Sequence, residues 1–370
     1  MIYLDNAATT ALSPAAIQAM TKTMTVFGNP SSTHSHGREA SKLLRQARED
    51  VAQALHTQSN KILFTSGGTE SNNTAIKGYA LRHQNRGKHI VTTAIEHHAV
   101  LEVVEYLVDK FGFEATFVQP VDGQIRAEEI KKALRPDTIL VSVMAVNNET
   151  GAILPIKEIG ELLQEHPAAF HVDAVQAIGK LPIYPDELGI DFLSASAHKF
   201  HGPKGVGFLY AEKMDFDNFM HGGDQEEKHR AGTENLISIT AMAAALSESM
   251  EHLEENLEHA QDLKNNLLAD LLDIDYYLNE SQPSLPYVIN LGFPNQKNDL
   301  LLLQMDLNGF SISTGSACTA GAIQPSHVLQ AMYGKDSNRL YESVRISTSD
   351  QATLQEIQSF TKKLKEILGG

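Results

Sequence analysis

The sequence contains a single cysteine, Cys318, and no tryptophan among its 370 residues. One thiol excludes an internal disulfide, a cysteine-rich zinc site and an iron–sulfur cluster held by this chain alone, and we expect no metal site. No apolar run approaches the length of about 18 residues that marks a membrane span. The first residues, MIYLDNAATT, lack the basic and then apolar pattern of a targeting segment. We therefore expect a soluble cytoplasmic protein with no membrane partner.

Positive charge is also scarce. Thirty Lys and Arg residues stand against 46 Asp and Glu residues, which gives a formal net charge of −16. Such a balance disfavours a broad direct contact with the phosphates of nucleic acid. The chain has neither a GxGxxG nor a GxxxxGK[ST] motif, which argues against a dinucleotide or a nucleoside triphosphate as ligand. Small molecules and other proteins are the partners that we expect.

One lysine stands in an unusual setting. In the stretch SASAHKFHGPKGVG, residues 194–207, Lys199 follows an apolar segment that predicts a buried strand and precedes a glycine-rich turn. A lysine at a buried strand end loses solvent, which lowers its pKa and frees the amine to form a Schiff base with a carbonyl cofactor. The alternative is a solvated surface charge, which is what most lysines are.

A possible phosphate site follows the segment KILFT, which predicts a strand. The next residues, SGGTESNN, predict a tight turn at 66–69 that opens a helix near Glu70. Unpaired N–H groups at a helix start and the helix dipole attract an anion, and Gly67 and Gly68 let that anion approach the backbone. A plain capped helix is the alternative reading of this segment.

Further polar side chains come directly after predicted strands. His97 and His98 follow HIVTTAI, Asn148 follows TILVSVMAV, and Asp173 and Gln176 follow the strand within AFHVDAVQ. Open α/β sheets bind ligands at the carboxyl ends of their strands, so we expect these groups to face one site. The pattern does not separate His97 from His98, and Asp173 could instead cap a helix.

The second half of the chain changes character. After the turn-rich patch HGGDQEEKHRAGTEN, a helical segment from about Leu236 to Leu272 runs without Gly or Pro. The later strands and helices predict a smaller α+β domain. We expect a large cofactor-binding domain at residues 15–250 and a small domain formed by residues 1–14 together with 251–370.

Two residues of the predicted small domain have chemical interest. Cys318 lies in STGSACTAGAIQPS, a segment too polar and glycine-rich to be core, which favours a reactive thiol over a buried one. Arg345 lies among β-branched residues in SVRIST and could bind a carboxylate with both arms of its guanidinium group. A structural ion pair is the alternative for Arg345.

A Schiff-base lysine, a phosphate site, an aspartate for a ring nitrogen, a histidine, a carboxylate-binding arginine and a thiol together fit pyridoxal phosphate. With these residues in view, the chain resembles the cysteine desulfurases of the NifS/IscS group, a branch of the fold-type I pyridoxal-phosphate enzymes related to class-V aminotransferases. The resemblance implies an α/β fold with a large domain, whose mostly parallel sheet is flanked by helices, and a smaller α+β domain. It rests on YLDNAATT, TSGGTESNN, EHHAV, NNETG, HVDAVQAIGK, SAHKFHGPKG, RAGTEN, STGSACTAG and VRIS.

The resemblance also implies how the cofactor is held. Lys199 would carry it as a Schiff base and later move the α-proton of the substrate. Asp173 would pair with the ring nitrogen, Gln176 with the ring oxygen, and His97 would lie over the ring and relay protons. The residues implied for the remaining cofactor contacts are Gly68, Thr69, Asn148, Ser196, His198 and, from a second subunit, Thr233. A residue shared in this way implies a homodimer.

For the substrate, the resemblance implies that Asn148 and Arg345 bind the carboxylate of L-cysteine. Cys318, as a thiolate, would attack the sulfur, which leaves a persulfide on Cys318 and releases L-alanine. A selenocysteine lyase, a class-V aminotransferase and a non-catalytic sulfur carrier are the alternatives.

The persulfide would pass to an acceptor protein in tRNA thiolation or iron–sulfur cluster assembly. The chain ends at Gly370 without the C-terminal extension with which better-known members dock a scaffold, so a tRNA-thiolating enzyme is a comparable candidate. The chain also departs from the family after Arg345, where it continues Ile346-Ser347-Thr348-Ser349.

Overall fold

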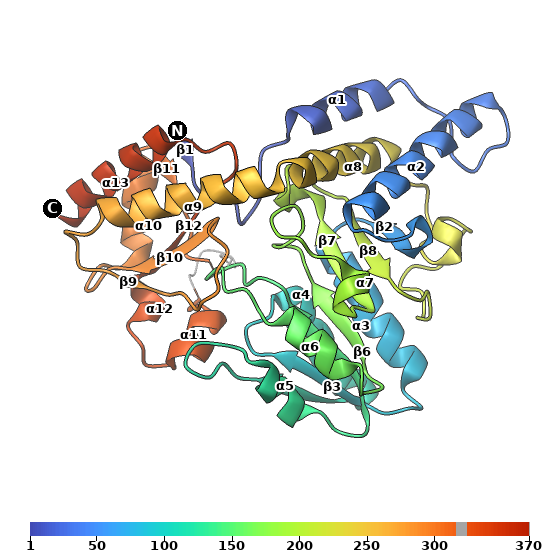
Figure 1. Cartoon of the computed structure of the whole chain (residues 1–370), viewed down its shortest axis with the longest axis horizontal. Helices are drawn as coiled ribbons and strands as arrows, with labels where there is room; N and C mark the ends of the chain where they lie inside the picture. The colour runs from blue at the N-terminus through green and yellow to red at the C-terminus, as the bar shows by residue number, and fades with distance from the viewer. Residues whose placement is uncertain (316–323, 370) are drawn as a thin grey trace.

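The computed structural model describes residues 1–315 and 324–369. At its centre is a seven-stranded sheet with the order β2-β8-β7-β6-β5-β3-β4 (Figure 1). Strand β8 runs antiparallel to both of its neighbours, and the other neighbouring pairs are parallel, which confirms the predicted mostly parallel sheet. The strands are β2 (Ile62–Thr65), β3 (His89–Thr93), β4 (Glu114–Val118), β5 (Thr138–Met144), β6 (Ala169–Asp173), β7 (Phe192–Ser196) and β8 (Gly207–Ala211).

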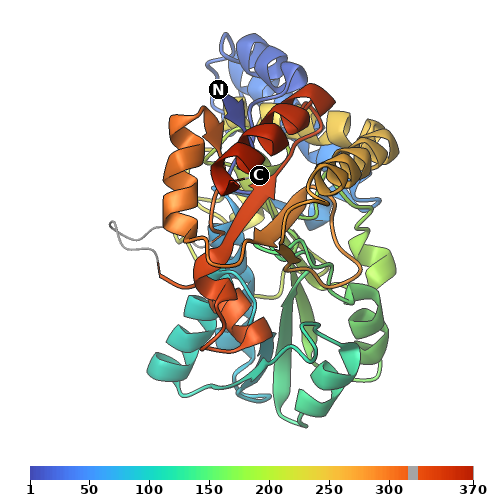
Figure 2. The same cartoon turned by 90° about the vertical axis from the view of Figure 1, so that its left-hand side faces the viewer.

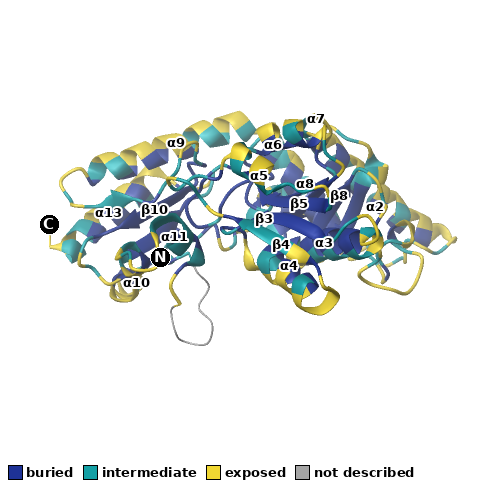
Figure 3. Ribbon diagram, turned by 90° about the horizontal axis from the view of Figure 1, so that it is seen from below, coloured by how far each residue is buried: buried dark blue, intermediate teal, exposed yellow. Residues whose placement is uncertain are grey.

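Helices cover both faces of this sheet, which explains why its strands are apolar without alternation. All seven residues of β5 are buried, and Figure 3 shows the exposed surface confined mainly to the helices and loops. One core packs α1, α2, α6 and α8 (Leu236–Glu251) against the sheet, and a second core packs α3 and α4. The other helices of this part are α1 (Pro14–Thr23), α2 (Ser35–Ala54), α3 (Gly68–His83), α4 (His98–Phe111), α5 (Ala127–Ala133), α6 (Ile156–Leu163) and α7 (Pro185–Leu188).

A second, smaller sheet has the antiparallel order β12-β10-β9, and beside it β1 pairs with β11 in parallel (Figure 2). A third core, which contains Leu4 and residues between 263 and 364, lies in this part of the molecule. The boundaries 1–14 with 251–370 stay a prediction. The elements are β1 (Ile2–Tyr3), α9 (Leu253–Asp270), β9 (Tyr277–Leu278), β10 (Val288–Gly292), α10 (Asn298–Leu307), β11 (Phe310–Ser311), α11 (His327–Tyr333), α12 (Arg339–Glu342), β12 (Ser343–Ser347) and α13 (Leu354–Leu368).

The helical segment expected from about Leu236 to Leu272 is two helices. Helix α8 ends at Glu251 and α9 begins at Leu253, because His252, with φ −107° and ψ 17°, leaves the helical conformation. The buried side chains change from the first core to the third within α9, between Ala260 and Leu263, and so after the break. Neither Gly nor Pro marks this position, so the sequence carried no local signal for it. None of the helices in the described residues combines the length and apolar character that a membrane span requires.

The third core gives a test of stability. Phe360 is fully buried on α13, whereas Leu354 on the same helix is 42% exposed. Because Phe360→Ala leaves a cavity, we expect it to lower the free energy of unfolding by about 3–5 kcal/mol, measured by urea denaturation. The control Leu354→Ala should change it by less than about 0.5 kcal/mol. Equal losses in the two variants would contradict this assignment of the core.

Candidate active site

A cavity of about 490 Å³ lies between the two sheets, at the carboxyl ends of β3, β5, β6 and β7. Most of the predicted site residues line it, namely Gly68, Thr69, His97, Asn148, Asp173, Gln176, Ser196, His198, Lys199 and Arg345. Cys318 lies outside the described residues, although Gly315, three positions before it, lines the cavity. Thr233 is exposed and does not line the cavity of its own chain. The topology therefore brings together strand ends that are far apart in the sequence, from Thr93 at the end of β3 to Ser196 at the end of β7.

Lys199 lies at the end of a short 3₁₀ turn that directly follows β7. Its Nζ donates hydrogen bonds to the carbonyl oxygens of Ala7 (2.6 Å) and Ala8 (2.8 Å). Burial, together with the positive charges of Lys180 and Arg345, lowers the pKa of Lys199 to about 7. A substantial fraction of Lys199 is therefore a neutral amine at neutral pH, as a nucleophilic lysine requires.

The first turn of α3, where the sequence predicts a phosphate site, begins without a side-chain cap. Gly67 stands at the N-cap position with φ +148° and provides no side-chain cap, so the plain capped helix is not what the structure shows. Ser196 and His198 line the same pocket as Gly68 and Thr69. A Cβ atom built on Gly68 would lie 2.5 Å from Val175 Cγ2, so only glycine lets the backbone approach this closely. The N–H groups at a helix start that no side chain caps attract a phosphate.

His198 contributes to this pocket as a neutral ring. Burial, together with the nearby ammonium groups of Lys199 and Lys204, lowers the pKa of His198 to about 4. Its Nδ1 lies 3.3 Å from Thr9 Oγ1. An anion in the pocket would find neutral hydrogen-bond donors together with the charge of the lysines.

Asp173 is buried at the end of β6 and accepts two hydrogen bonds. Its Oδ2 accepts from Asn72 Nδ2 (2.7 Å), and its Oδ1 accepts from the N–H of Val175 (3.0 Å). The second contact caps a turn, so the capping interpretation is partly realised. The sequence analysis missed Asn72, although its position three residues after Thr69 on one helix was a usable signal. Among the residues that the structure describes, Asn72 Oδ1 is buried with no hydrogen-bond partner, which leaves an acceptor for a ligand.

Gln176 connects the cavity wall to the N-terminal segment. Its Nε2 donates to the carbonyl of Ala7 (2.9 Å), which also accepts from Lys199. Behind it, Lys180 Nζ lies 3.4 Å from Gln176 Oε1. Burial lowers the pKa of Lys180 to about 8. Lys180 was also missed, because a lysine one helical turn after a glutamine is ordinary in a sequence.

The structure separates the two adjacent histidines. His97 lines the cavity and caps α4, where its Nδ1 accepts from the N–H of Ala99 (3.0 Å). Burial lowers its pKa below the usual value. The His98 ring lies outside the cavity lining and packs against His327, with 4.8 Å between the ring centroids. Of the two rings, His97 is the one that lines the cavity. The role of His97 in catalysis stays a prediction.

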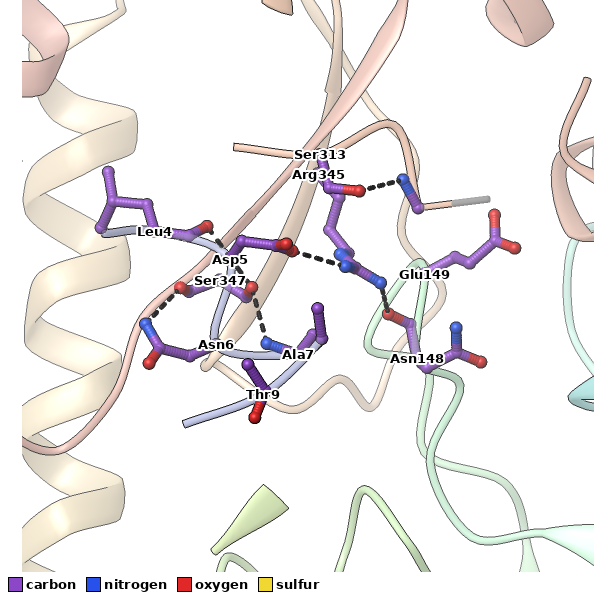
Figure 4. A network of polar contacts seen from close by, with 12 residues as sticks. Leu4, Asp5, Asn6, Ala7, Thr9, Asn148, Glu149, Ser313, Arg345 and Ser347 are labelled. Carbon is purple, nitrogen blue, oxygen red and sulfur yellow. Dashed lines mark hydrogen bonds and ion pairs between the residues drawn. The ribbon is translucent and has the colours of Figure 1, made fainter. Parts of the chain in front are cut away.

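Arg345 lies on β12 between the two parts of the molecule (Figure 4). Its guanidinium group donates to Asp5 Oδ1 (2.7 Å) and to the carbonyl oxygen of Asn148 (2.9 Å). The ion-pair interpretation is thus realised with Asp5, a residue 340 positions away. Arg345 also lines the cavity, and its buried Nε has no partner among the described residues.

These features fit pyridoxal 5′-phosphate. The uncapped helix start suits a phosphate, the buried Asp173 suits a ring nitrogen that carries a proton, and the Lys199 amine suits an aldehyde. The described residues contain no group of three or more His, Cys, Asp or Glu side chains that could hold a metal ion.

Comparison with known families agrees with this chemistry. The family profile described as aminotransferase class-V matches residues 2–360. The chain belongs to the class-V aminotransferase family, in its cysteine desulfurase branch. Enzymes of this family use pyridoxal 5′-phosphate.

The relatives of this desulfurase extend over its full length. It is 45% identical to the putative cysteine desulfurase IscS 1 of Bacillus subtilis over 99% of this chain and 98% of that protein. It is 42% identical to the cysteine desulfurase IscS of Methanosarcina thermophila over 99% and 92% of the two chains. A solved NifS-like protein matches with a TM-score of 0.93 and 36% identity, over 100% of this chain and 99% of that chain. This match confirms fold type I. A structure described as SspA in complex with cysteine matches with a TM-score of 0.84 and 33% identity, over 95% and 100%.

The lowered pKa of Lys199 predicts how cofactor attachment depends on pH. Only the neutral amine attacks an aldehyde, so the rate of attachment to the cofactor-free protein should rise as the pH passes through about 7 and then level off. If Lys199 had the ordinary lysine pKa of 10.5, the rate would keep rising with pH up to about that value. The link is measured by borohydride reduction and intact mass.

Two variants control this experiment. Lys199→Ala should give no reducible link. Lys180→Met should move the midpoint to higher pH, because it removes a positive charge that lowers the Lys199 pKa. A midpoint near 10 in the unaltered protein would contradict the prediction.

Proposed function

We propose that this desulfurase removes sulfur from L-cysteine, releases L-alanine and keeps the sulfur as a persulfide on Cys318. The observation that carries the proposal is the Lys199 amine, which faces one cavity together with an anion site and a buried aspartate. The step balances: the carbon–sulfur bond of cysteine breaks, a sulfur–sulfur bond forms at Cys318, and protons replace sulfur on the carbon of alanine. Full-length similarity to cysteine desulfurases supports it.

The chain's own residues would hold the cofactor at its two ends. The backbone of Gly68 and Thr69, with Ser196 and His198, would bind the phosphate. Asp173 and Gln176 would bind the ring, and the free acceptor on Asn72 is available beside them. When bound, pyridoxal phosphate supplies an electron sink for the substrate's α-carbon.

Lys199 is suited to move the α-proton. It exchanges a proton near neutral pH because burial holds its pKa at about 7, and general bases work best near the operating pH. His97 faces the same cavity, and its lowered pKa keeps its ring mainly neutral, so that it can accept and return a proton.

Arg345 and Asn148 would bind the carboxylate of the substrate. Arg345 is 4% exposed, so a carboxylate that reaches it loses water and gains a strong charge-assisted hydrogen bond. In the structure Asp5 already pairs with Arg345, so the substrate would compete with Asp5 or use the free Nε.

A homodimer with shared sites is part of the proposal. Thr233 is exposed, in a loop anchored by the ion pair of Arg230 with Glu70 (2.9 Å), which leaves it accessible to a second subunit. Large apolar side chains are exposed nearby in the sequence of α1 and the loop after it: Ile17 is 51%, Met24 62% and Phe27 81% exposed. Exposed large apolar side chains of this kind support an interface.

We also propose that Cys318 passes its sulfur to an acceptor protein in tRNA thiolation or iron–sulfur cluster assembly, in the cytoplasm. The net charge of −16 supports an acceptor that itself holds the tRNA, because this chain would repel the phosphates.

Asp173 should act through its charge. Asp173→Asn cannot hold a proton on the ring nitrogen, so we expect alanine formation to fall by at least about 100-fold with the fold retained, as judged by circular dichroism. Asn72→Ala is the matched control, since it removes one of the two donors to Asp173 without changing its charge. Equal losses in both variants would mean that the hydrogen bonds matter and the charge does not.

Cys318→Ala should separate substrate binding from sulfur transfer. We expect this variant to bind the cofactor and to change its absorbance on addition of cysteine, because the residues for both lie elsewhere. The intact protein mass after incubation with cysteine should show one added sulfur on the unaltered chain alone. Alanine, and no keto acid, should be the product. Full alanine production by the variant would remove Cys318 from the mechanism.

A further inference from the structure

A carboxylate stands in the first turn of the helix at which the proposed function places the cofactor phosphate. Glu70 lies on α3, directly after Thr69. It is buried and lines the same pocket as Ser196 and His198. A buried negative charge opposes an anionic ligand, because like charges in a site with little water repel strongly. A phosphate is therefore favoured in this pocket only if another group offsets the charge of Glu70.

Arg230 pairs with this carboxylate through both arms of its guanidinium group. Its Nε donates to Glu70 Oε1 (2.9 Å), and its Nη2 donates to Glu70 Oε2 (3.3 Å). The side chain of Arg230 is 22% exposed and that of Glu70 is 8% exposed, so solvent screens the pair only in part. Arg230 itself is not among the described residues that line the phosphate pocket. Within this chain, its closest effect on the pocket is thus on the charge of Glu70.

The hydrogen bonds to Glu70 keep it ionised. Burial alone would raise the pKa of Glu70, but the hydrogen bonds from Arg230 and from the N–H of Ser66 (2.8 Å) lower this pKa below its usual value. The negative charge is therefore present at neutral pH. The N–H of Ser66 belongs to the turn before α3, so the Glu70 side chain also holds that turn in place. A substitution of Glu70 must keep this acceptor if only the charge is to change.

Other groups of the pocket do not replace Arg230. The His198 ring is neutral at neutral pH, because burial and neighbouring lysines lower its pKa to about 4. Lys204 lines the pocket but is exposed, so water and salt screen its charge. In the part of the chain that the structure describes, the Glu70 carboxylate thus depends on Arg230 for its counter-charge.

We propose that Arg230 neutralises Glu70 and so leaves the start of α3 able to bind the phosphate of pyridoxal phosphate. Arg230 is then a positioning residue, which acts through Glu70 and not by contact with the cofactor. The inference rests on the proposed function, in which the phosphate lies at Gly68 and Thr69. It assigns this ion pair to cofactor binding as well as to stability. A change in the charge of the pair should therefore alter the affinity for a ligand that carries a phosphate and not for one that lacks it.

The test compares pyridoxal 5′-phosphate with pyridoxal, which lacks the phosphate. Their dissociation constants are measured by calorimetry on the full-length protein freed of cofactor. Arg230→Gln leaves the charge of Glu70 unpaired, so we expect it to weaken the binding of pyridoxal 5′-phosphate by at least about tenfold. The affinity for pyridoxal should change by less than about threefold, because pyridoxal brings no anion to the pocket. Inorganic phosphate, used as a competitor, should also bind more weakly to this variant.

A second substitution separates the charge from the structure. Glu70→Gln keeps an oxygen for the N–H of Ser66 and removes the negative charge, so it should bind pyridoxal 5′-phosphate at least as tightly as the unaltered protein. The double variant, Arg230→Gln with Glu70→Gln, should return to within about threefold of the unaltered protein, since two residues of one ion pair do not act additively. If Arg230 served instead to place Thr233 for a second subunit, the double variant would stay as weak as Arg230→Gln.

A second ion pair of similar build gives a matched control. Arg48 donates to both carboxylate oxygens of Glu226 (2.8 and 2.6 Å), and its side chain is 19% exposed. Glu226 also accepts a backbone N–H, that of Phe64 (2.8 Å). Neither Arg48 nor Glu226 is among the described residues of the phosphate pocket. Arg48→Gln should therefore lower the melting temperature but leave the ratio of the two dissociation constants unchanged.

Four outcomes would overturn the proposal: unchanged binding of pyridoxal 5′-phosphate by Arg230→Gln, an equal loss of affinity for pyridoxal, no recovery in the double variant, or the same change of the ratio in Arg48→Gln. Failure of the proposed function looks different. The unaltered protein itself would then bind pyridoxal 5′-phosphate no more tightly than pyridoxal and would form no alanine from cysteine.

Discussion

The contact of the Lys199 amine with the carbonyl oxygens of Ala7 and Ala8 is the interaction on which the site depends. It keeps the lysine amine away from bulk water, and this burial lowers the pKa of Lys199. The same contact places the N-terminal segment across the carboxyl edge of the large sheet. The same segment is bound to β12, because Ser347 Oγ accepts from the N–H of Ala7 (2.9 Å). The first residues of the chain thus join the two sheets exactly where the cavity forms between them.

Groups of both charge signs surround the cavity. Lys199 and Arg345 line it together with Asp5 and Asp173, and Lys180 lies behind Gln176. The positive charges of Lys180 and Arg345 lower the pKa of Lys199 together with burial. Asp173 and Asp5 each accept hydrogen bonds on their carboxylates. The few buried cations thus lie close to the Lys199 amine, in a chain whose net charge is −16.

Much of the architecture could be read from periodicity and composition. Continuous apolar runs such as TILVSVM predicted buried parallel strands, and the glycines of SGGTE predicted the uncapped start of α3, because these signals are local. The interruption at His252 had no local signal, since neither Gly nor Pro lies there. Asn72 and Lys180 could not be singled out for a related reason: an amide or a lysine in a helix or turn is common, and only its neighbours in space reveal its use.

The sequence by itself determined the class of chemistry, because a lysine, an anion-binding turn and polar residues after parallel strands must meet at one edge of such a sheet. It also determined the family, through motifs spread from YLDNAATT to VRIS. Only the tertiary structure decided that His97 and not His98 faces the cavity and that Arg345 pairs with Asp5. Those contacts join residues far apart in the chain, and they depend on how the two sheets pack rather than on any local preference of the backbone.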